Sequence, residues 1–246
     1  DVIACEGTRT SGSLLKHFDI HNRLIAYHNF NEESSANGIL ELLRDGKNIA
    51  LISDAGYPLI NDPGQKIVTL ATSEGFNVVP VSGPSAFLNA LVASGLVAQP
   101  FIFIGFLPQS HSDRVKKLKE YENYPMTMIF YEAPHRIEKC LKDCMEVFGD
   151  RKMTLARELT KMHEEFLRGS ISEILEVINE LRGEMVIVMD GNHEDKSKAI
   201  DMNTIIEMVN ASVENGMSTK DAIKDAAKKT GISKNRIYDA VNSNRN

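Results

Sequence analysis

The sequence predicts an α/β fold with a short helical segment at its C-terminal end, and three observations support this prediction. Short apolar runs alternate with helical patterns up to Gly191. Many of these runs are β-branched or continuously apolar, which is typical of strands buried on both faces of a sheet. No strand pattern remains after residue 201. Over residues 2–95 the alternating order predicts parallel strands joined by right-handed crossovers.

The first predicted block, residues 1–107, is an N-terminal α/β domain. Its strands are expected at residues 2–5, 24–28, 48–53 and 77–81. A helix is expected over residues 31–46, because Asn31 can cap it, glutamates follow in its first turn, and Gly46 can end it. A second helix is expected over residues 83–95.

The second predicted block, residues 108–191, is a C-terminal α/β domain. It is joined to the first by the stretch FIGFLPQSHSD, in which Pro108 and a polar run interrupt the apolar pattern. Strands are expected at residues 101–107, 127–131, 153–156 and 185–189, and helices at residues 113–121, 135–148 and 172–181. The strand at residues 101–107 precedes this block in the chain and leads into the joint between the two blocks.

A third block is predicted to be helical. Residues 192–201 resemble a solvated linker, and residues 202–246 form a tail in which the stretch from Ser218 onward has a helix-turn-helix pattern. Ala227, Gly231 and Ile237 stand where such a motif needs a small contact residue, a turn residue and a core anchor. Many helical hairpins share this pattern.

Composition narrows the class of protein. The chain has 246 residues, a formal net charge of -6 and three cysteines. An odd cysteine number argues against a disulfide framework and fits a reducing cytoplasm, and two thiols four residues apart do not make a zinc site, so we expect no metal. No apolar run approaches the ~20 residues of a membrane span. Because the net charge is negative, any nucleic-acid partner must be bound by local basic patches.

The most unusual stretch is LISDAGYPLINDPG, residues 51–64, which follows a predicted strand. A loop at this end of a parallel sheet faces the edge where α/β folds bind ligands. The loop contains Asp54, Asn61 and Asp62 but no Lys or Arg. These side chains suit hydroxyls, amines or a cation better than a phosphate. The alternative is a tight turn stiffened by Pro58 and Pro63.

Three more polar clusters follow predicted strands. They are the stretches VPVSGPSA, IFYEAPHRI and LARELTKMHEE, which contain Ser85, Glu132, Arg136, Glu158 and Lys161. Clusters of this kind in two domains predict a ligand cleft between them.

Seven stretches in order resemble one family: DVIACEGTR, NIALISDAGYPLINDPG, VVPVSGPSA, FIGFLP, IFYEAPHRI, LARELTK and GEMVIV. They look like the small-subunit ribosomal RNA cytidine-2'-O-methyltransferases of the tetrapyrrole methylase superfamily. The resemblance runs from Asp1 to about Gly191, and the helical tail matches the family's terminal extension. It implies two α/β domains of tetrapyrrole methylase type with S-adenosylmethionine in the cleft, usually in a homodimer. The implied substrate is a cytidine in the decoding region of 16S rRNA, within the small ribosomal subunit.

The resemblance also implies site residues. Asp54, Ala55 and Gly56 match the family's cofactor loop, and Ser85 and Ala86 match its second contact. The segments expected to line the adenine and methionine sides contain Tyr131, Ala156 and Met185.

Two departures from the family stand out. The family begins with a strand and a Pro-x-Gly-Asn loop before this chain's first residue, so we expect an N-terminal piece to be missing. It also has an Asp where this chain has Gly7. That difference weakens a catalytic role for this position.

Methyl transfer to a ribose hydroxyl needs alignment above all. Positioning can supply about 7–11 kcal/mol of the barrier, against a factor of about 10²–10⁴ from a general base. The candidates to accept the proton or orient the hydroxyl are Glu6, Glu132 and Glu158. The candidates to contact RNA phosphates or lower the hydroxyl's pKa are Arg9, Arg136 and Lys161. The alternative for each is a structural ion pair at a strand end.

Two other functions are compatible with parts of the sequence. One is a small-molecule methylase of the same superfamily with a tetrapyrrole substrate, and the other is a nucleic-acid-binding regulator that uses the fold as a ligand sensor. The tail contains the best basic patch: Lys220, Lys224, Lys228, Lys229, Lys234 and Arg236. It can bind the RNA backbone, or it can be a solubilising helical appendage.

Overall fold

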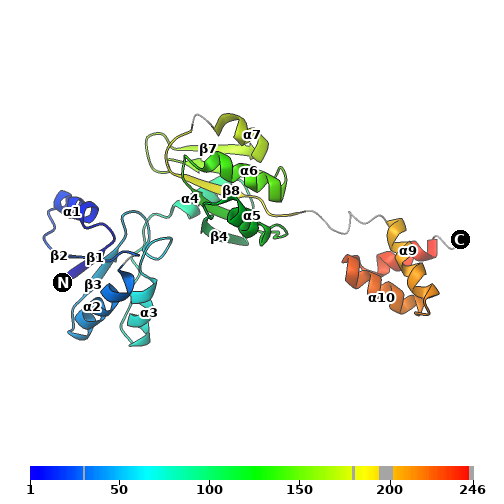
Figure 1. Cartoon of the computed structure of the whole chain (residues 1–246), viewed down its shortest axis with the longest axis horizontal. Coiled ribbons are helices and arrows are strands. Elements are labelled where there is room, and N and C mark those ends of the chain that lie inside the picture. The colour runs from blue at the N-terminus through cyan, green and yellow to red at the C-terminus, as the bar shows by residue number, and fades with distance from the viewer. Residues whose placement is uncertain (30, 179–180, 194–201, 244–246) are drawn as a thin grey trace. The chain divides into compact units, whose positions relative to one another are not determined.

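The computed structural model describes residues 1–29, 31–178, 181–193 and 202–243 (Figure 1). The chain divides into two compact units, Asp1–Asn192 and His193–Asn246. The first unit contains two sheets and the second contains helices. The α/β fold class with a helical C-terminal part is therefore confirmed. The predicted linker falls largely on residues outside the described ranges.

The first sheet has three parallel strands in the order β2-β1-β3. They are β1 (Val2–Cys5), β2 (Arg23–Ala26) and β3 (Ile49–Ile52). The helices between and after them are α1 (Thr8–His17), α2 (Glu32–Arg44) and α3 (Gln65–Ser73). The parallel order predicted for these strands is confirmed, whereas α1 and α3 were not predicted.

A buried tyrosine joins the helices of this layer. The Tyr27 hydroxyl donates to Glu32 Oε1 at 3.2 Å and accepts from the Ile67 amide at 3.3 Å. Burial raises the pKa of Tyr27 well above its ordinary value, so the hydroxyl stays a donor. Ile39 and Leu40 of α2 pack beside it in the same apolar cluster.

The prediction of a strand at residues 77–81 is wrong, because the structure has no strand there. Val79 and Val81 are 69% and 83% exposed. β-branched residues favour an extended backbone, but a strand also needs a hydrogen-bonded neighbour. None of the described residues pairs with this segment.

The second sheet has five strands in the order β4-β5-β8-β6-β7. They are β4 (Phe101–Phe106), β5 (Thr127–Glu132), β8 (Met185–Met189), β6 (Lys152–Arg157) and β7 (Glu165–Ser170). Only β4 and β5 pair in parallel, and the other neighbours are antiparallel. The strand β7 was not predicted, because Arg168 and Gly169 interrupt its apolar pattern at the edge of the sheet.

Helices cover both faces of this sheet (Figure 1). One face packs against α5 (His111–Lys119), α6 (Ile137–Phe148) and α7 (Ile171–Val177), with Phe130, Leu141 and Ile187 in the core between them. The other face packs against α4 (Ala86–Ser94), through Ala90 and Leu91. Both α4 and β4 therefore lie with the second sheet, although they precede residue 107.

Over residues 202–243, the second unit is a bundle of three helices with its own core. Its helices are α9 (Met202–Glu214), α10 (Thr219–Thr230) and α11 (Lys234–Ser243). Ser218 caps α10 by accepting from the Asp221 amide at 3.1 Å, and Gly231 ends it with φ 74°. Ile237 is fully buried in the bundle core. In the described ranges, no helix is long and apolar enough to cross a membrane.

Candidate functional site

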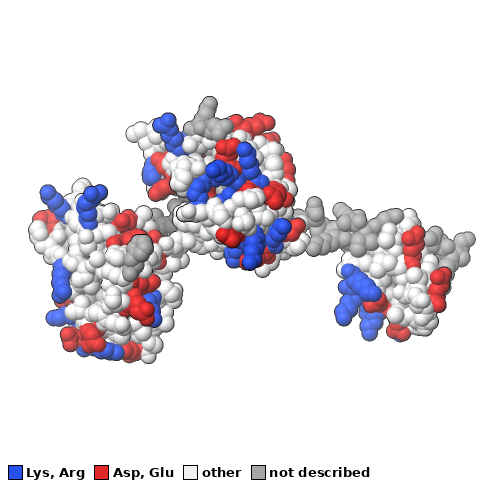
Figure 2. All heavy atoms as spheres, viewed as in Figure 1, with Lys and Arg blue, Asp and Glu red and all other residues white. Residues whose placement is uncertain are grey.

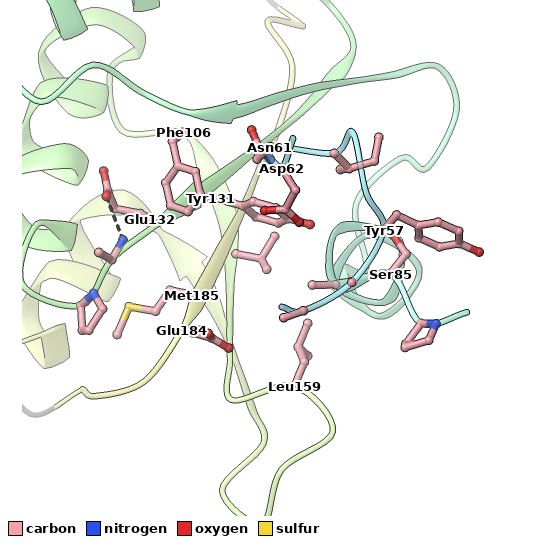
Figure 3. Close-up of a pocket in the computed structure, with 18 residues that line it drawn as sticks. Tyr57, Asn61, Asp62, Ser85, Phe106, Tyr131, Glu132, Leu159, Glu184 and Met185 are labelled. Atoms are coloured by element: carbon pink, nitrogen blue, oxygen red, sulfur yellow. Dashed lines mark hydrogen bonds between the residues drawn. The ribbon is translucent and has the colours of Figure 1, made fainter. Parts of the chain in front are cut away.

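A cavity of about 400 Å³ lies at the strand ends of the first unit (Figure 3). One wall is the loop after β3, which contributes residues 55–57 and 60–62. The turn before α4 contributes Pro84, Ser85 and Ala86. The ends of the second sheet contribute Phe106, Tyr131 and Met185, among others. Both predicted α/β regions therefore supply walls of one cavity.

The backbone of the loop after β3 is unusual. Gly56 and Gly64 have φ values of 80° and 148°, and Leu59 and Asn61 also have positive values, 72° and 65°. Non-glycine residues adopt this region only at an energetic cost, and such strain clusters at functional sites. The Tyr57 hydroxyl accepts a hydrogen bond from the Gly83 amide at 2.6 Å. This bond ties the loop to the turn before α4.

The charged residues that line the cavity are acidic: Asp62, Glu132 and Glu184 line it, and no Lys or Arg is among its described lining residues. Glu132 and Glu184 are paired with Arg136 and Lys161, which do not line the cavity, whereas Asp62 has no ion-pair partner among the described residues. Burial raises the pKa of the Asp62 carboxyl, and the charges of Glu6 and Asp54 raise it further. The pKa of the Tyr131 hydroxyl is also raised, first by burial and then by the charge of Asp62. A cavity of this kind favours a cationic ligand.

Most of the residues predicted to bind the cofactor line this cavity: Ala55, Gly56, Ser85, Ala86, Tyr131 and Met185. Ala156 lies behind the wall, fully buried in the apolar cluster that includes Tyr131 and Val186. Asp54 is not a lining residue. Its carboxylate instead accepts from the Gly7 amide at 3.1 Å and from the Thr10 hydroxyl at 3.3 Å.

The contact between Asp54 and residue 7 explains one departure from the family. A Cβ atom on Gly7 would lie 2.7 Å from Asp54 Oδ2. Glycine therefore lets the carboxylate reach the backbone at the N-terminal end of α1, where it bonds an amide that the helix leaves free.

Among the predicted catalytic residues, only Glu132 lines the cavity. Its side chain is fully buried, its Oε1 accepts from the Ala133 amide at 2.8 Å, and the same oxygen lies 3.2 Å from Arg136 Nε. Glu6 lies beside the loop, where its Oε2 accepts from the Asp54 amide at 3.4 Å. Arg9 is exposed on α1 and does not line the cavity.

The other two, Glu158 and Lys161, belong to an ion-pair cluster after β6. Lys161 Nζ lies 3.1 Å from Glu158 Oε1 and 3.2 Å from Glu184 Oε2. The Glu184 amide also donates to Glu158 Oε1 at 3.1 Å. Lys161 lowers the pKa of Glu158, whose carboxylate raises that of Lys161. Of these three residues, Glu184 alone faces the cavity.

Several lining residues were not selected from the sequence, among them Tyr57, Phe106, Leu159 and Glu184. Phe106 and Glu184 stand in the quoted stretches FIGFLP and GEMVIV. Their position beside a strand end was a usable signal, but apolar and acidic residues there also have ordinary structural roles.

One group outside the cavity has metal-ligand chemistry: His111, Asp143 and Glu146, with ligand atoms within 4.8 Å of one another. Asp143 Oδ2 already accepts from the buried Arg114 Nε at 2.6 Å, and Asp143 Oδ1 lies 3.0 Å from His111 Nδ1. Because the guanidinium neutralises Asp143, the group is explained as a buried ion pair.

The family model for tetrapyrrole (corrin/porphyrin) methylases matches residues 1–175. The ribosomal RNA small subunit methyltransferase I of Bacillus subtilis is 43% identical, over 98% of this chain and 84% of the relative. Relatives of the same name from Streptococcus pyogenes serotype M1 and Micromonospora olivasterospora are each 38% identical, over 97% and 98% of this chain and 84% and 77% of their own.

Solved structures share the fold at low identity. The crystal structure of the methyltransferase CobJ superposes with a TM-score of 0.54 at 16% identity, covering 78% of this chain and 93% of that one. A cobalt precorrin-4 methyltransferase superposes with a TM-score of 0.51, also at 16% identity, covering 77% and 83%.

Proposed function

The chain belongs to the tetrapyrrole methylase family and, within it, to the ribosomal RNA small subunit methyltransferases I, and from this membership we propose that it methylates the ribose 2'-OH of a cytidine in the decoding region of 16S rRNA. Methyl transfer to ribosomal RNA is the activity that the names of the relatives carry. The finer part of the proposal, the cytidine and its 2'-OH, rests on the resemblance of the seven sequence stretches.

The single observation that best supports the cofactor is the set of residues that lines the cavity. About 400 Å³ of space is bounded by apolar side chains and by carboxylates, without a lysine or arginine among the described lining residues. Such a donor set fits the sulfonium, ammonium and ribose hydroxyls of S-adenosylmethionine better than a phosphate-bearing cofactor. When bound, S-adenosylmethionine supplies an electrophilic methyl group.

The chain's own residues then have three tasks. Asp62 and the backbone around Gly56 would hold the positively charged groups of S-adenosylmethionine. Tyr131 and Met185 would line its adenine and methionine sides, with Ala156 packed behind them. Glu132, which is paired with Arg136, would orient the ribose hydroxyl of the substrate at the cavity wall. Glu158 and Lys161 act through Glu184, which they hold at the wall. Positioning of this kind can supply about 7–11 kcal/mol without a dedicated base. Glu6 and Arg9 stay candidates for substrate contact.

Incubation with S-adenosylmethionine labelled in its methyl group tests this function. We expect label in small ribosomal subunits or free 16S rRNA, at a ribose 2'-OH of cytidine by nuclease mapping, and none in a porphyrinoid substrate. Label in the porphyrinoid alone would favour the small-molecule methylase. Cofactor binding without any transfer would favour the regulator.

The tail is proposed to bind the RNA backbone. Lys220, Lys224 and Lys228 are exposed and four residues apart, so they lie on one face of α10. None of the three has an ion-pair partner among the residues that the structure describes. Like charges at this spacing destabilise a helix, so their presence here favours a polyanionic partner. Figure 2 shows basic side chains gathered on one side of the tail.

A triple substitution of Lys220, Lys224 and Lys228 by Gln tests the tail while preserving its helices. We expect unchanged cofactor affinity and weaker binding of small subunits. The slope of log affinity against log salt concentration should be less steep by about 0.7–0.9 for each phosphate that is no longer neutralised. Deletion of residues 202–246 is expected to have a larger effect in the same direction. Equal affinity and equal salt dependence in both variants would make the tail a packing element. The homodimer stays a prediction from the resemblance, and the cytoplasmic location stays a prediction from the cysteine count.

A further inference from the structure

We propose that Phe106 is a stacking platform for the target nucleobase, which it holds at the mouth of the cavity while the ribose of the same nucleotide enters. The proposal rests on the proposed function, since it assigns a residue to the recognition of RNA by that site. Ribosomal RNA is read mainly through unstacked bases, which proteins commonly hold on aromatic side chains.

A bulge in β4 turns Phe106 toward the cavity. Residues of a regular strand alternate between the two faces of the sheet. Ile102 and Ile104 pack toward α5 and α6, whereas Phe103 packs with Tyr131 on the opposite face. Without a bulge, Phe106 would follow the isoleucines. The register of β4 against β5 shifts between Phe103 and Gly105, so that Phe106 lies opposite Tyr131 on the cavity side.

Gly105 makes this bulge possible. Its φ is 77°, a conformation that side chains disfavour, and a Cβ there would lie 2.3 Å from Asn61 Oδ1. Glycine adopts this φ without strain, so the strand can turn and contact the loop after β3 immediately before Phe106. Bulges that redirect one side chain are common beside active sites.

The Phe106 ring is packed against other aromatic side chains on one side and exposed to solvent on the other. The rings of Phe106 and Tyr131 meet edge to face with centroids 5.6 Å apart. Tyr131 is in turn held by Phe103 at 5.0 Å, and Phe103 stacks on Phe87 at 4.4 Å. Phe106 nevertheless remains 53% exposed. A fixed ring with a free face is what base stacking needs.

A polar group stands beside this ring. Asn61 lines the cavity next to Gly105, and its side-chain amide has no hydrogen-bond partner among the described residues. Figure 3 shows Asn61 and Asp62 beside the rings of Phe106 and Tyr131. An amide both donates and accepts hydrogen bonds, as the edge of a pyrimidine does. Phe106 therefore offers a stacking face for the base, and Asn61 offers a hydrogen-bonding contact to its edge.

The target base fits this position better than the adenine of the cofactor. The cavity floor is formed by side chains such as Met185 and Val186, which are 2% and 5% exposed. A cofactor enclosed at that depth would contact these side chains, while Phe106 is at the rim. A base stacked at the rim would direct its own ribose inward.

The test compares Phe106→Ala, Phe106→Leu and Phe106→Tyr with a matched control, Phe101→Ala. Phe101 is at the other end of β4, is 36% exposed, and belongs to the same aromatic group without lining the cavity. Three quantities are measured for each full-length variant: S-adenosylmethionine affinity by calorimetry, affinity for unmethylated small subunits, and kcat/KM for their methylation.

We expect Phe106→Ala to reduce kcat/KM for small subunits by about 5- to 140-fold, the effect of losing one base–aromatic stack, with cofactor affinity unchanged. Phe106→Leu should lose nearly as much, because it keeps apolar volume without a π face. Phe106→Tyr should recover most of the loss because it restores the π face, and Phe101→Ala should stay near wild type. Wild-type activity in Phe106→Leu, or a loss confined to cofactor affinity, would overturn the stacking role alone. A wild-type protein that methylates no small subunit would overturn the proposed function itself.

Discussion

The loop after β3 and the segment after β6 both follow strands and both contain carboxylates, but their charges are arranged differently. In the loop, burial raises the pKa of Asp62, and the charges of Glu6 and Asp54 raise it further. After β6, Glu158 is paired with Lys161 and has a lowered pKa, and Arg157 lies 2.6 Å from Glu165. In the segment after β6, each of these carboxylates is therefore neutralised by a basic side chain. In the loop after β3, no cation is paired with Asp62 among the described residues, and a carboxyl with a perturbed pKa beside a cavity is a candidate for ligand binding.

Substitution of Gly56 by Val should have the largest effect on S-adenosylmethionine affinity, and it tests whether the loop after β3 is the part that binds the cofactor. Gly56 has φ 80°, and nothing lies within 4 Å of a Cβ placed on it, so a Val branch would be strained and would project into the open cavity. We expect no detectable S-adenosylmethionine binding by calorimetry. Gly75→Val is the matched control, because Gly75 has the same φ and the same open surroundings outside the cavity. Equal affinity in the two variants would remove the loop from the site.

Asp62→Asn should reduce S-adenosylmethionine affinity by about tenfold or more, because it removes a partly desolvated charge from a cationic ligand. The same change should raise the melting temperature at neutral pH, since it relieves repulsion from Glu6 and Asp54. Asp45→Asn, on the surface after α2, is the control. A variant with lower affinity and lower stability would contradict the idea that this charge is kept for a ligand.

The pH dependence of Asp62 has a definite sign. Its pKa is raised by folding, so its protonated form stabilises the fold below the ordinary aspartate pKa, and that stabilisation is lost as pH rises through the raised value. The difference in melting temperature between Asp62→Asn and wild type should therefore vanish in acid and appear above that window. Cofactor affinity of the wild type should fall as pH drops through the same window. An unchanged difference at all pH values would exclude Asp62 as the titrating group.

Asp54→Ala should have a smaller effect on the cofactor than Asp62→Asn, because Asp54 is directed toward α1. Loss of its bonds to Gly7 and Thr10 should cost about 1 kcal/mol of unfolding free energy, or about 2–4 °C in melting temperature. Asp54→Asn, which keeps an acceptor oxygen, is the control. If Asp54→Ala abolished binding and Asp62→Asn did not, the roles assigned to the two carboxylates would be reversed.

Lys161→Met should have the smallest effect and tests the other side of the comparison. Its ion pairs are exposed, so S-adenosylmethionine affinity should stay within about twofold of wild type. The pKa of Glu158 should rise, because Lys161 is the first cause of its depression. Lys116→Met, on α5, is the control. A large loss of affinity would show that the cluster after β6 binds the cofactor directly.

Local sequence patterns were sufficient where the residue types repeat with one clear period. The strands β1, β3, β5 and β8 were predicted because their runs are continuously apolar, and the helices α2, α6 and α10 because apolar residues recur at helical spacing. The edge strand β7 has no such run, and residues 77–81 have the composition of a strand without a partner. Pairing depends on distant neighbours, which propensity does not describe.

The sequence by itself determined the family and the segments that form the cavity, since seven motifs in order match one family and polar residues at strand ends converge on one edge of a sheet. Only the tertiary structure decided which side chains face that cavity. Asp54 and Asp62 look alike in the loop, but the hydrogen bonds of Asp54 direct it to α1, and Asp62 remains at the cavity wall. Phe106 reaches the same cavity through the bulge at Gly105. The direction of a side chain follows from backbone dihedrals and contacts between distant segments, and no local pattern of residue types specifies these.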